Sequence, residues 1–202
     1  MSHFVIVGAG QAGSSLAAKL RDDGFDGEIT LIGDETAPPY QRPPLSKAYL
    51  LGDMPRERLF LRADSFYQER NITLRTGTAV TAIDPAARTL ALGTETLAYD
   101  QLALTTGSLP RTLPASIGGT LDGLYTVRTL ADIDALEPEV RKGRRVLIIG
   151  GGLAGLEHLD LGLLLEPGAL LGRDDLQLFE PASVEVDRIG LLPRLELLGE
   201  LV

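Results

Sequence analysis

Short apolar runs separated by glycine turns open the chain. Residues 4–7 form a largely β-branched run that stops at Gly8, and residues 11–20 carry apolar side chains at helical spacing. A second apolar run, residues 28–32, follows a turn signal at Asp22-Asp23-Gly24. The order strand, glycine turn, helix, strand predicts a βαβ unit of an open α/β sheet, because parallel strands need a crossover of this kind.

The middle of the chain alternates loops with short strand-like runs. Residues 34–63 hold five prolines and little periodicity, which predicts an ordered loop with a short helix near residues 46–50. Residues 63–70 are predicted to be helical. The remaining runs are predicted to form a β-meander packed on the first sheet, at residues 72–74, 79–83, 89–92 and 96–98, and a further buried strand at residues 102–105.

The opening pattern returns later in the chain. After a predicted helix at residues 129–142, residues 145–149 form a strand-like run, glycines follow, and residues 176–179 are the candidate closing strand. This repeat predicts a second, partial Rossmann-like unit. We therefore expect one domain at residues 1–110 and another at residues 111–202. Pro167 and Gly168 interrupt the second crossover, and the leucine-rich end of the chain has no period that we can assign.

Composition and charge narrow the function classes. Among 202 residues, 19 Lys and Arg stand against 28 Asp and Glu, and the net charge of −9 repels nucleic-acid backbones and anionic lipids. No apolar run reaches the roughly 18 residues of a membrane span. We expect no nucleic-acid partner and no membrane contact. Because no basic leader precedes the first strand, we also expect a cytoplasmic location.

The chain has no cysteine, and its two histidines, His3 and His158, are far apart in the sequence. These counts exclude disulfide scaffolds, thiolate catalysis and redox chemistry on a pair of cysteines. They also predict that the chain has no metal site. Redox work by such a chain would need a bound organic cofactor such as a flavin.

The first glycine turn, Gly8-Ala9-Gly10-Gln11-Ala12-Gly13, matches the dinucleotide-binding pattern G-x-G-x-x-G between a strand and a helix. In that pattern the first glycine allows the tight turn, the second lets a pyrophosphate approach the backbone, and the third lets the helix pack on the strand. The helix N-terminus offers N–H groups and a positive dipole to the phosphates. We predict phosphate binding here; the alternative is an ordinary glycine-rich turn.

Two acidic residues, Asp34 and Glu35, follow the second predicted strand. A carboxylate at this place in a dinucleotide fold accepts hydrogen bonds from the ribose hydroxyls and disfavours a 2′-phosphate. Both residues are therefore candidate ribose ligands. The alternative is an acidic loop that only faces solvent.

A second candidate dinucleotide site follows the run at residues 145–149. Gly150, Gly152 and Gly155 repeat the glycine pattern, and Glu180 ends the next candidate strand. Pro167 lies in the long interval between them, which keeps open the alternative of a glycine turn that binds nothing. Two dinucleotide sites in one chain suggest an electron relay, in which a nicotinamide delivers hydride to a flavin and the flavin passes electrons onward.

Several motifs fit one known pattern. They are the first glycine turn, residues 29–35, the run Arg42-Pro43-Pro44-Leu45-Ser46-Lys47, residues 102–107 with Pro110-Arg111, residues 125–130 and residues 145–157. Over residues 1–157 the chain resembles FAD-dependent, NADH-using ferredoxin reductases of the putidaredoxin and rhodocoxin reductase type, within the pyridine nucleotide-disulfide oxidoreductase superfamily. The run from Arg42 to Lys47 is the most specific part of the resemblance.

The resemblance implies FAD and NAD as cofactors, NADH as electron donor and a ferredoxin-type acceptor. It implies an α/β fold in which a Rossmann-like FAD-binding domain with a β-meander precedes a partial Rossmann-like NAD-binding unit. It also implies a catalytic pair, Lys47 near the flavin N5 and Glu157, because a cation there stabilises a reduced anionic flavin. Together with the two glycine patterns, it gives these cofactor-binding residues: Gly8, Gly10, Ala12, Gly13, Asp34, Glu35, Arg42, Lys47, Val80, Thr106, Gly107, Arg128, Gly150, Gly152, Gly155 and Glu180.

The later parts of such reductases are not visible in the sequence, so the chain is similar to a truncated or internally deleted relative. The expected function is an FAD-dependent oxidoreductase that passes electrons from NADH to a ferredoxin-type acceptor. The alternative is a non-catalytic nucleotide-binding module that forms a homo-oligomer through its leucine-rich end. An NAD-dependent dehydrogenase is disfavoured, because the loop at residues 42–47 has no role in it.

Overall fold

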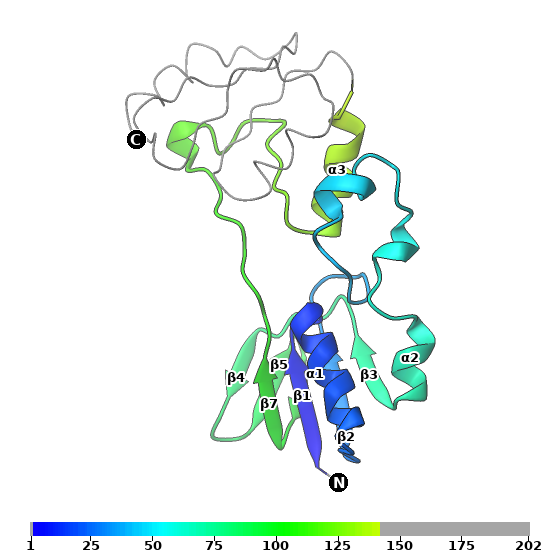
Figure 1. Ribbon diagram of the computed structural model, residues 1–202. Coiled ribbons are helices and arrows are strands. Elements are labelled where there is room, and N and C mark those ends of the chain that lie inside the picture. Colours follow the sequence, from blue (N-terminus) through cyan, green and yellow to red (C-terminus); the bar gives the residue numbers. More distant parts are fainter. Residues whose placement is uncertain (1, 142–202) are drawn as a thin grey trace, which may run out of the picture. The chain divides into compact units, whose positions relative to one another are not determined.

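The computed structural model describes residues 2–141 of the chain, which divides into two units (Figure 1). The first unit comprises Met1–Arg42 and Met54–Leu109, and the second comprises Pro43–Asp53 and Pro110–Val202. The sequence analysis placed residues 43–53 in the first domain, so the two divisions differ at this loop. The proposed domain boundary at residue 110 stays a prediction.

Within the described residues, the first unit contains a four-stranded parallel sheet in the order β3-β2-β1-β7 (Figure 1). Its strands are β1 (His3–Val7), β2 (Glu28–Ile32), β3 (Ile72–Arg75) and β7 (Gln101–Leu104). The chain runs outward from β1 through β2 to β3 and then returns to the other side of β1 as β7. The strand order therefore reverses between β1 and β7, and their carboxyl ends meet at that point.

One face of the parallel sheet is covered by helices α1 (Gln11–Asp22) and α2 (Asp64–Glu69). Ile6, Ile29 and Leu31 point to this face and pack in one core cluster with Ala17 of α1 and Tyr67 of α2. Side chains on a strand alternate between its two faces, so every second residue of β1 and β2 joins this cluster. The apolar helical spacing seen in the sequence is the inner stripe of α1.

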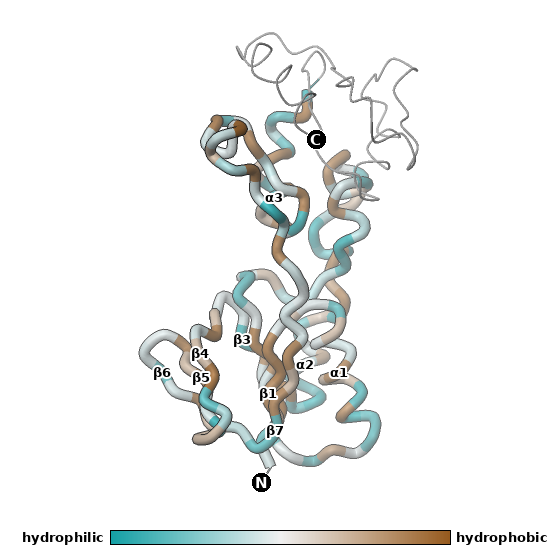
Figure 2. The backbone as a smooth tube through the Cα atoms, turned by 90° about the vertical axis from the view of Figure 1, so that its left-hand side faces the viewer, coloured by the Kyte–Doolittle hydropathy of each residue, from teal (hydrophilic) through white to brown (hydrophobic). Residues whose placement is uncertain are grey.

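The opposite face of the parallel sheet is covered by a three-stranded antiparallel sheet. Its strands are β4 (Ala82–Asp84), β5 (Thr89–Leu92) and β6 (Glu95–Ala98). Val5, Val7 and Ile32 pack against Leu90 and Leu92 of this second sheet, and Figure 2 shows hydrophobic colour along β1 and β5. Both faces of β1 are thus buried, which explains why β1 is a continuous apolar run in the sequence.

Three predictions about strands were wrong in detail. Residues 72–74 do not belong to the meander, because β3 follows α2 as the far end of a crossover and pairs in parallel with β2. The strand predicted at residues 79–83 is β4, which begins only at Ala82. The strand predicted as buried at residues 102–105 is β7, an outer strand of the described sheet, and Leu104 is 59% exposed.

The second unit contains short helical segments. They are η1 (Leu45–Tyr49), η3 (Ala115–Ile117), α3 (Leu130–Leu136) and η4 (Glu137–Glu139), while η2 (Arg56–Leu59) belongs to the first unit. Helix α3 begins with a capping box, in which the Thr129 hydroxyl accepts from the Asp132 N–H and the Asp132 carboxylate accepts from the Thr129 N–H. The sequence predicted a helix to residue 142, but α3 ends at Leu136, because Pro138 has no N–H to continue the helical hydrogen bonds.

Predictions for the second Rossmann-like unit and for the leucine-rich end fall on residues 142–202, outside the described residues. Across residues 2–141, no helix combines the length and the apolar character that crossing a membrane requires.

Candidate dinucleotide site

The glycine turn of residues 8–13 joins β1 to α1 at the carboxyl edge of the parallel sheet. Gly8 has a φ of +112°, and a Cβ added there would lie 2.2 Å from the carbonyl oxygen of Thr105. A Cβ added to Gly13 would lie 2.1 Å from the carbonyl oxygen of Gly8. Real Cβ atoms do not approach backbone this closely, so both positions require glycine for the turn and for the packing of α1.

Gly10 is surrounded differently. A Cβ added there would meet no atom within 4 Å. Gly10 is the N-cap of α1, no side chain of the described residues caps it, and the first turn of the helix holds no acidic residue. The N-terminus of α1 therefore directs backbone N–H donors and the positive end of its dipole toward open space, an arrangement that favours anions.

Thr105 follows β7 and hydrogen-bonds to the start of the glycine turn. Its hydroxyl donates a hydrogen bond to the Gly8 carbonyl at 2.8 Å, and its backbone N–H donates to the Val7 carbonyl at 2.7 Å. Thr105 and Gly8 thus mark the point where the strand order reverses, which is where open α/β sheets bind their ligands. The sequence pattern gave no reason to select Thr105; the residues predicted for the site, Thr106 and Gly107, are exposed.

The two acidic residues after β2 have different surroundings. Asp34 is exposed, and its Oδ1 accepts from the backbone N–H of Glu35 at 3.0 Å. Glu35 is half-buried, and both of its carboxylate oxygens accept hydrogen bonds, Oε2 from the Tyr40 hydroxyl at 2.5 Å and Oε1 from Arg42 Nη2 at 2.6 Å. The structure therefore brings Glu35 and Arg42 together around Tyr40, a residue that sequence reasoning did not select for the site.

The other predicted site residues are distributed over both units. Ala12 is exposed on the first turn of α1, and Val80 packs against the core beneath the meander. In the second unit, Lys47 interrupts η1 with non-helical φ and ψ of −122° and −113°, and the Arg128 N–H donates to Asp132 at 2.9 Å. Their roles toward a cofactor stay predictions. The predicted residues outside the described part of the chain are Gly150, Gly152, Gly155, Glu157 and Glu180.

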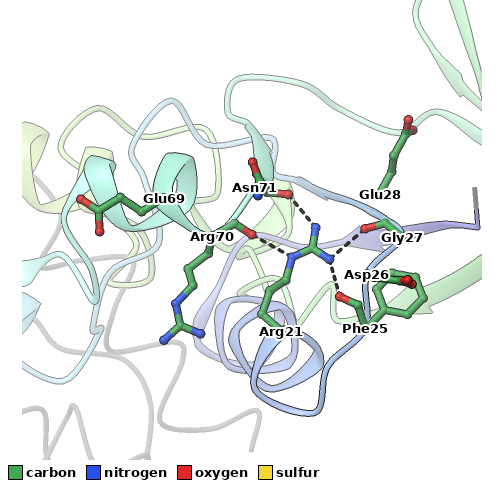
Figure 3. Close-up of a pocket in the computed structure, with 8 residues that line it drawn as sticks. All are labelled: Arg21, Phe25, Asp26, Gly27, Glu28, Glu69, Arg70 and Asn71. Carbon is green, nitrogen blue, oxygen red and sulfur yellow. Dashed lines mark hydrogen bonds between the residues drawn. The ribbon is translucent and has the colours of Figure 1, made fainter.

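A cavity of about 510 Å³ lies at the opposite, amino edge of the parallel sheet (Figure 3). Arg21 lines this cavity. Its guanidinium donates to four backbone carbonyls, at 2.6 to 2.8 Å: those of Phe25, Gly27, Arg70 and Asn71. These carbonyls belong to the turns that lead into β2 and β3. Since four of the five guanidinium N–H groups serve these turns, we assign the cavity to the scaffold.

Acidic and histidine side chains are spread out over the described residues. Among residues 2–141 no group of three or more of them could hold a metal ion. The described part of the candidate site offers backbone N–H donors at the N-terminus of α1 and an exposed carboxylate at Asp34.

The comparisons with known proteins agree with this geometry. Residues 2–158 match the family model described as pyridine nucleotide-disulphide oxidoreductase. The probable ferredoxin reductase CtmF of Castellaniella defragrans is 44% identical over 154 residues, which cover 76% of this chain and 37% of that protein. Rhodocoxin reductase of Rhodococcus erythropolis is 44% identical over 155 residues, which cover 76% of this chain and 36% of that protein.

A solved structure extends the comparison to the fold. The putidaredoxin reductase–putidaredoxin covalent complex matches with a TM-score of 0.73 and 42% identity, over 78% of this chain and 38% of that chain. This chain thus spans a little over a third of the length of these relatives. The predicted resemblance to ferredoxin reductases and the predicted Rossmann-like α/β fold are confirmed. Because the family model matches most of its 202 residues, the chain belongs to the pyridine nucleotide-disulphide oxidoreductase family.

Proposed function

We propose that this chain is an FAD-dependent oxidoreductase of the ferredoxin reductase type, which passes electrons from NADH through a flavin to a ferredoxin-type acceptor. The observation that carries the proposal is the glycine turn, in which Gly8 and Gly13 are closed by backbone while Gly10 opens onto the uncapped N-terminus of α1. The similarity to proteins named as ferredoxin reductases supports the same conclusion. FAD, when bound, would accept hydride from NADH and supply single electrons to a ferredoxin-type acceptor.

The residues of the first unit would bind and orient the ADP half of the cofactor. The α1 N-terminus would donate N–H groups to the diphosphate, and the missing side chain of Gly10 would let it come close. The exposed carboxylate of Asp34 would accept from the ribose. Thr105 would keep the turn in the shape that binds, because its hydroxyl holds the Gly8 carbonyl.

Lys47 and Glu157 remain the proposed catalytic pair. The Lys47 ammonium would supply positive charge where the flavin ring gains negative charge, and the Glu157 carboxylate would keep that lysine protonated. Nicotinamide binding is proposed at the second glycine pattern, Gly150, Gly152 and Gly155, with Glu180 at the end of the next strand. We also propose a cytoplasmic location, which cell fractionation tests.

The competing function is a nucleotide-binding module without catalysis that self-associates through its leucine-rich end. The matched segment, 36 to 38% of the relatives' length, contains the glycine turn of residues 8–13. This turn alone accounts for nucleotide binding and does not require catalysis. The visible absorption spectrum of the purified chain, with and without NADH, separates the two. A flavin band that NADH bleaches supports the oxidoreductase, a colourless protein that binds ADP supports the module, and a protein that binds neither FAD nor ADP contradicts both.

A further inference from the structure

Glu35, Tyr40 and Arg42 form a closed cluster directly after the candidate ribose ligand Asp34. The Tyr40 hydroxyl donates to Glu35 at 2.5 Å and accepts from Arg42 Nη1 at 3.1 Å, while Arg42 Nη2 donates to Glu35 at 2.6 Å. The guanidinium carbon of Arg42 also lies 5.0 Å from the centre of the Tyr40 ring. Each of the three side chains therefore contacts the other two.

The surrounding residues hold the cluster in place. Tyr40 is 5% exposed, so its ring is part of the core. The Glu35 carbonyl accepts from the Gly77 N–H at 2.8 Å. The chain around Tyr40 pairs with the segment around Phe60, through an antiparallel bridge between these two residues. A half-buried ion pair in such a fixed setting is screened less by salt than a surface pair.

Asp34 and Glu35 therefore differ in what they can give to a ligand. Both oxygens of the Glu35 carboxylate serve Tyr40 and Arg42. To accept from a ribose, Glu35 would have to weaken a charge-assisted pair. The exposed Asp34 carboxylate uses one oxygen on a backbone N–H and keeps further acceptor capacity.

From this contrast we infer that Glu35 is a positioning residue that holds Arg42 through the Tyr40 cluster, and that it does not share the ribose contact already proposed for Asp34. The inference rests on the proposed binding of an ADP-containing cofactor at this site. Arg42 is one of the predicted cofactor contacts, and its guanidinium would bring positive charge to the anionic nucleotide. Glu35 would then affect nucleotide binding only by fixing the position of this guanidinium. The sequence suggested two ribose carboxylates; the cluster assigns them separate tasks.

The first test compares ADP with 2′,3′-dideoxy-ADP, by titration calorimetry on the full chain. We expect the wild-type chain to prefer ADP by about tenfold, because a carboxylate that accepts from hydroxyls contributes this much. Asp34→Asn should reduce the preference to about twofold. Glu35→Gln should weaken both ligands by the same factor and keep the preference, while Glu57→Gln, an exposed control with the same charge change, should behave as wild type. Loss of the preference in Glu35→Gln would overturn the inference.

The second test asks whether Glu35 acts through Arg42. In the wild-type background Glu35→Gln should weaken ADP binding about fivefold, and in an Arg42→Met background it should have no further effect, because the group that it positions is gone. A full fivefold effect in the Arg42→Met background would mean that Glu35 touches the nucleotide itself. If Glu35→Gln does not fold, Glu35→Asp replaces it, since the shorter side chain keeps the charge but cannot reach both Tyr40 and Arg42 as glutamate does.

The outcomes separate this inference from the proposed function. A wild-type chain that binds no ADP contradicts the proposed function. A wild-type chain that binds ADP and its dideoxy analogue equally overturns the role of Asp34. A Glu35→Gln variant that binds ADP as tightly as wild type overturns the role of Glu35, while the FAD assignment stands.

Discussion

The two edges of the parallel sheet use backbone polar groups in opposite ways. At the amino edge, the Arg21 guanidinium donates to four carbonyls of the turns before β2 and β3, and a cavity is left beside it. At the carboxyl edge, the N-terminus of α1 has no side-chain cap among the described residues, and the space at Gly10 is open. The hollow at the amino edge is thus lined by carbonyls that the scaffold already satisfies, whereas the carboxyl edge presents backbone donors to open space.

The two edges therefore differ in how far the fold itself satisfies their backbone polar groups. The carbonyls around Arg21 already have a donor from within the fold, so a ligand there would compete with the protein itself. The N–H groups of the first turn of a helix have no partner within the helix. An anion that supplies acceptors at Gly10 therefore gains bonds without breaking others.

The largest effect on stability is expected at Gly13. Gly13→Val should lower the free energy of unfolding by about 3 kcal/mol or more, because its Cβ would lie 2.1 Å from the Gly8 carbonyl oxygen. Gly10→Ala is the matched control, and its loss should stay below about 1 kcal/mol because nothing lies within 4 Å. Urea unfolding followed by circular dichroism measures both. Equal losses would show that the turn is not packed as described.

Arg21→Met tests the amino edge. We expect a loss of about 2 kcal/mol in the free energy of unfolding, because four carbonyls lose a charged donor and only water can replace it. ADP affinity should stay within about twofold of wild type. Arg58→Met, at an exposed position, is the control for loss of the charge. A selective loss of ADP binding in Arg21→Met would place the site at the wrong edge.

Substitution of Thr105 should have a smaller effect, on both stability and ADP affinity. Thr105→Val removes the hydroxyl that donates to Gly8 and should cost about 1 kcal/mol of stability together with a few-fold loss of ADP affinity. Thr105→Ser keeps the hydroxyl and should restore most of both quantities. If serine and valine behave alike, the methyl group and not the hydrogen bond holds the turn.

The smallest effect is expected at Glu95, an exposed residue of β6. Arg75 donates to both carboxylate oxygens of Glu95 at 2.7 Å, and this hydrogen bonding lowers the pKa of Glu95 below its ordinary value. A lowered pKa gives stability that is present above the unfolded carboxyl's pKa and is lost as the pH falls through the folded pKa. The difference in urea midpoint between wild type and Glu95→Gln should therefore shrink between pH 7 and roughly pH 3. A difference that grows on acidification would contradict the pairing.

Local sequence patterns predicted most helices and strands of the first unit, but they did not predict which strands pair with one another. The strand at residues 28–32 and the strand at residues 89–92 have the predicted bounds, because each is an apolar run bounded by turn residues. The place of β3 was missed, since a short apolar run does not reveal which sheet it joins. Helix α3 ended early because one proline outweighed the helical spacing around it.

The residues of the candidate site also fall into those that a local motif identifies and those that depend on tertiary contacts. Glycines 8, 10 and 13 and Asp34 could be selected because the motif itself carries their spacing. Thr105 could not, because its role depends on β7 lying beside β1 across nearly a hundred residues of chain. The separate task that we infer for Glu35 also depends on contacts with Tyr40 and Arg42 that the spacing alone does not give.

The central claim, that the carboxyl edge binds the diphosphate of a dinucleotide at Gly10, is tested most directly by ADP titration of the wild-type chain and of Gly10→Val. The backbone of Gly10 is extended, with a φ of −94° and a ψ of −163°, so valine is compatible with the fold there. We predict that Gly10→Val keeps the wild-type unfolding transition within about 1 kcal/mol and binds ADP at least about tenfold more weakly. A variant that keeps both the transition and the wild-type ADP affinity would contradict the account.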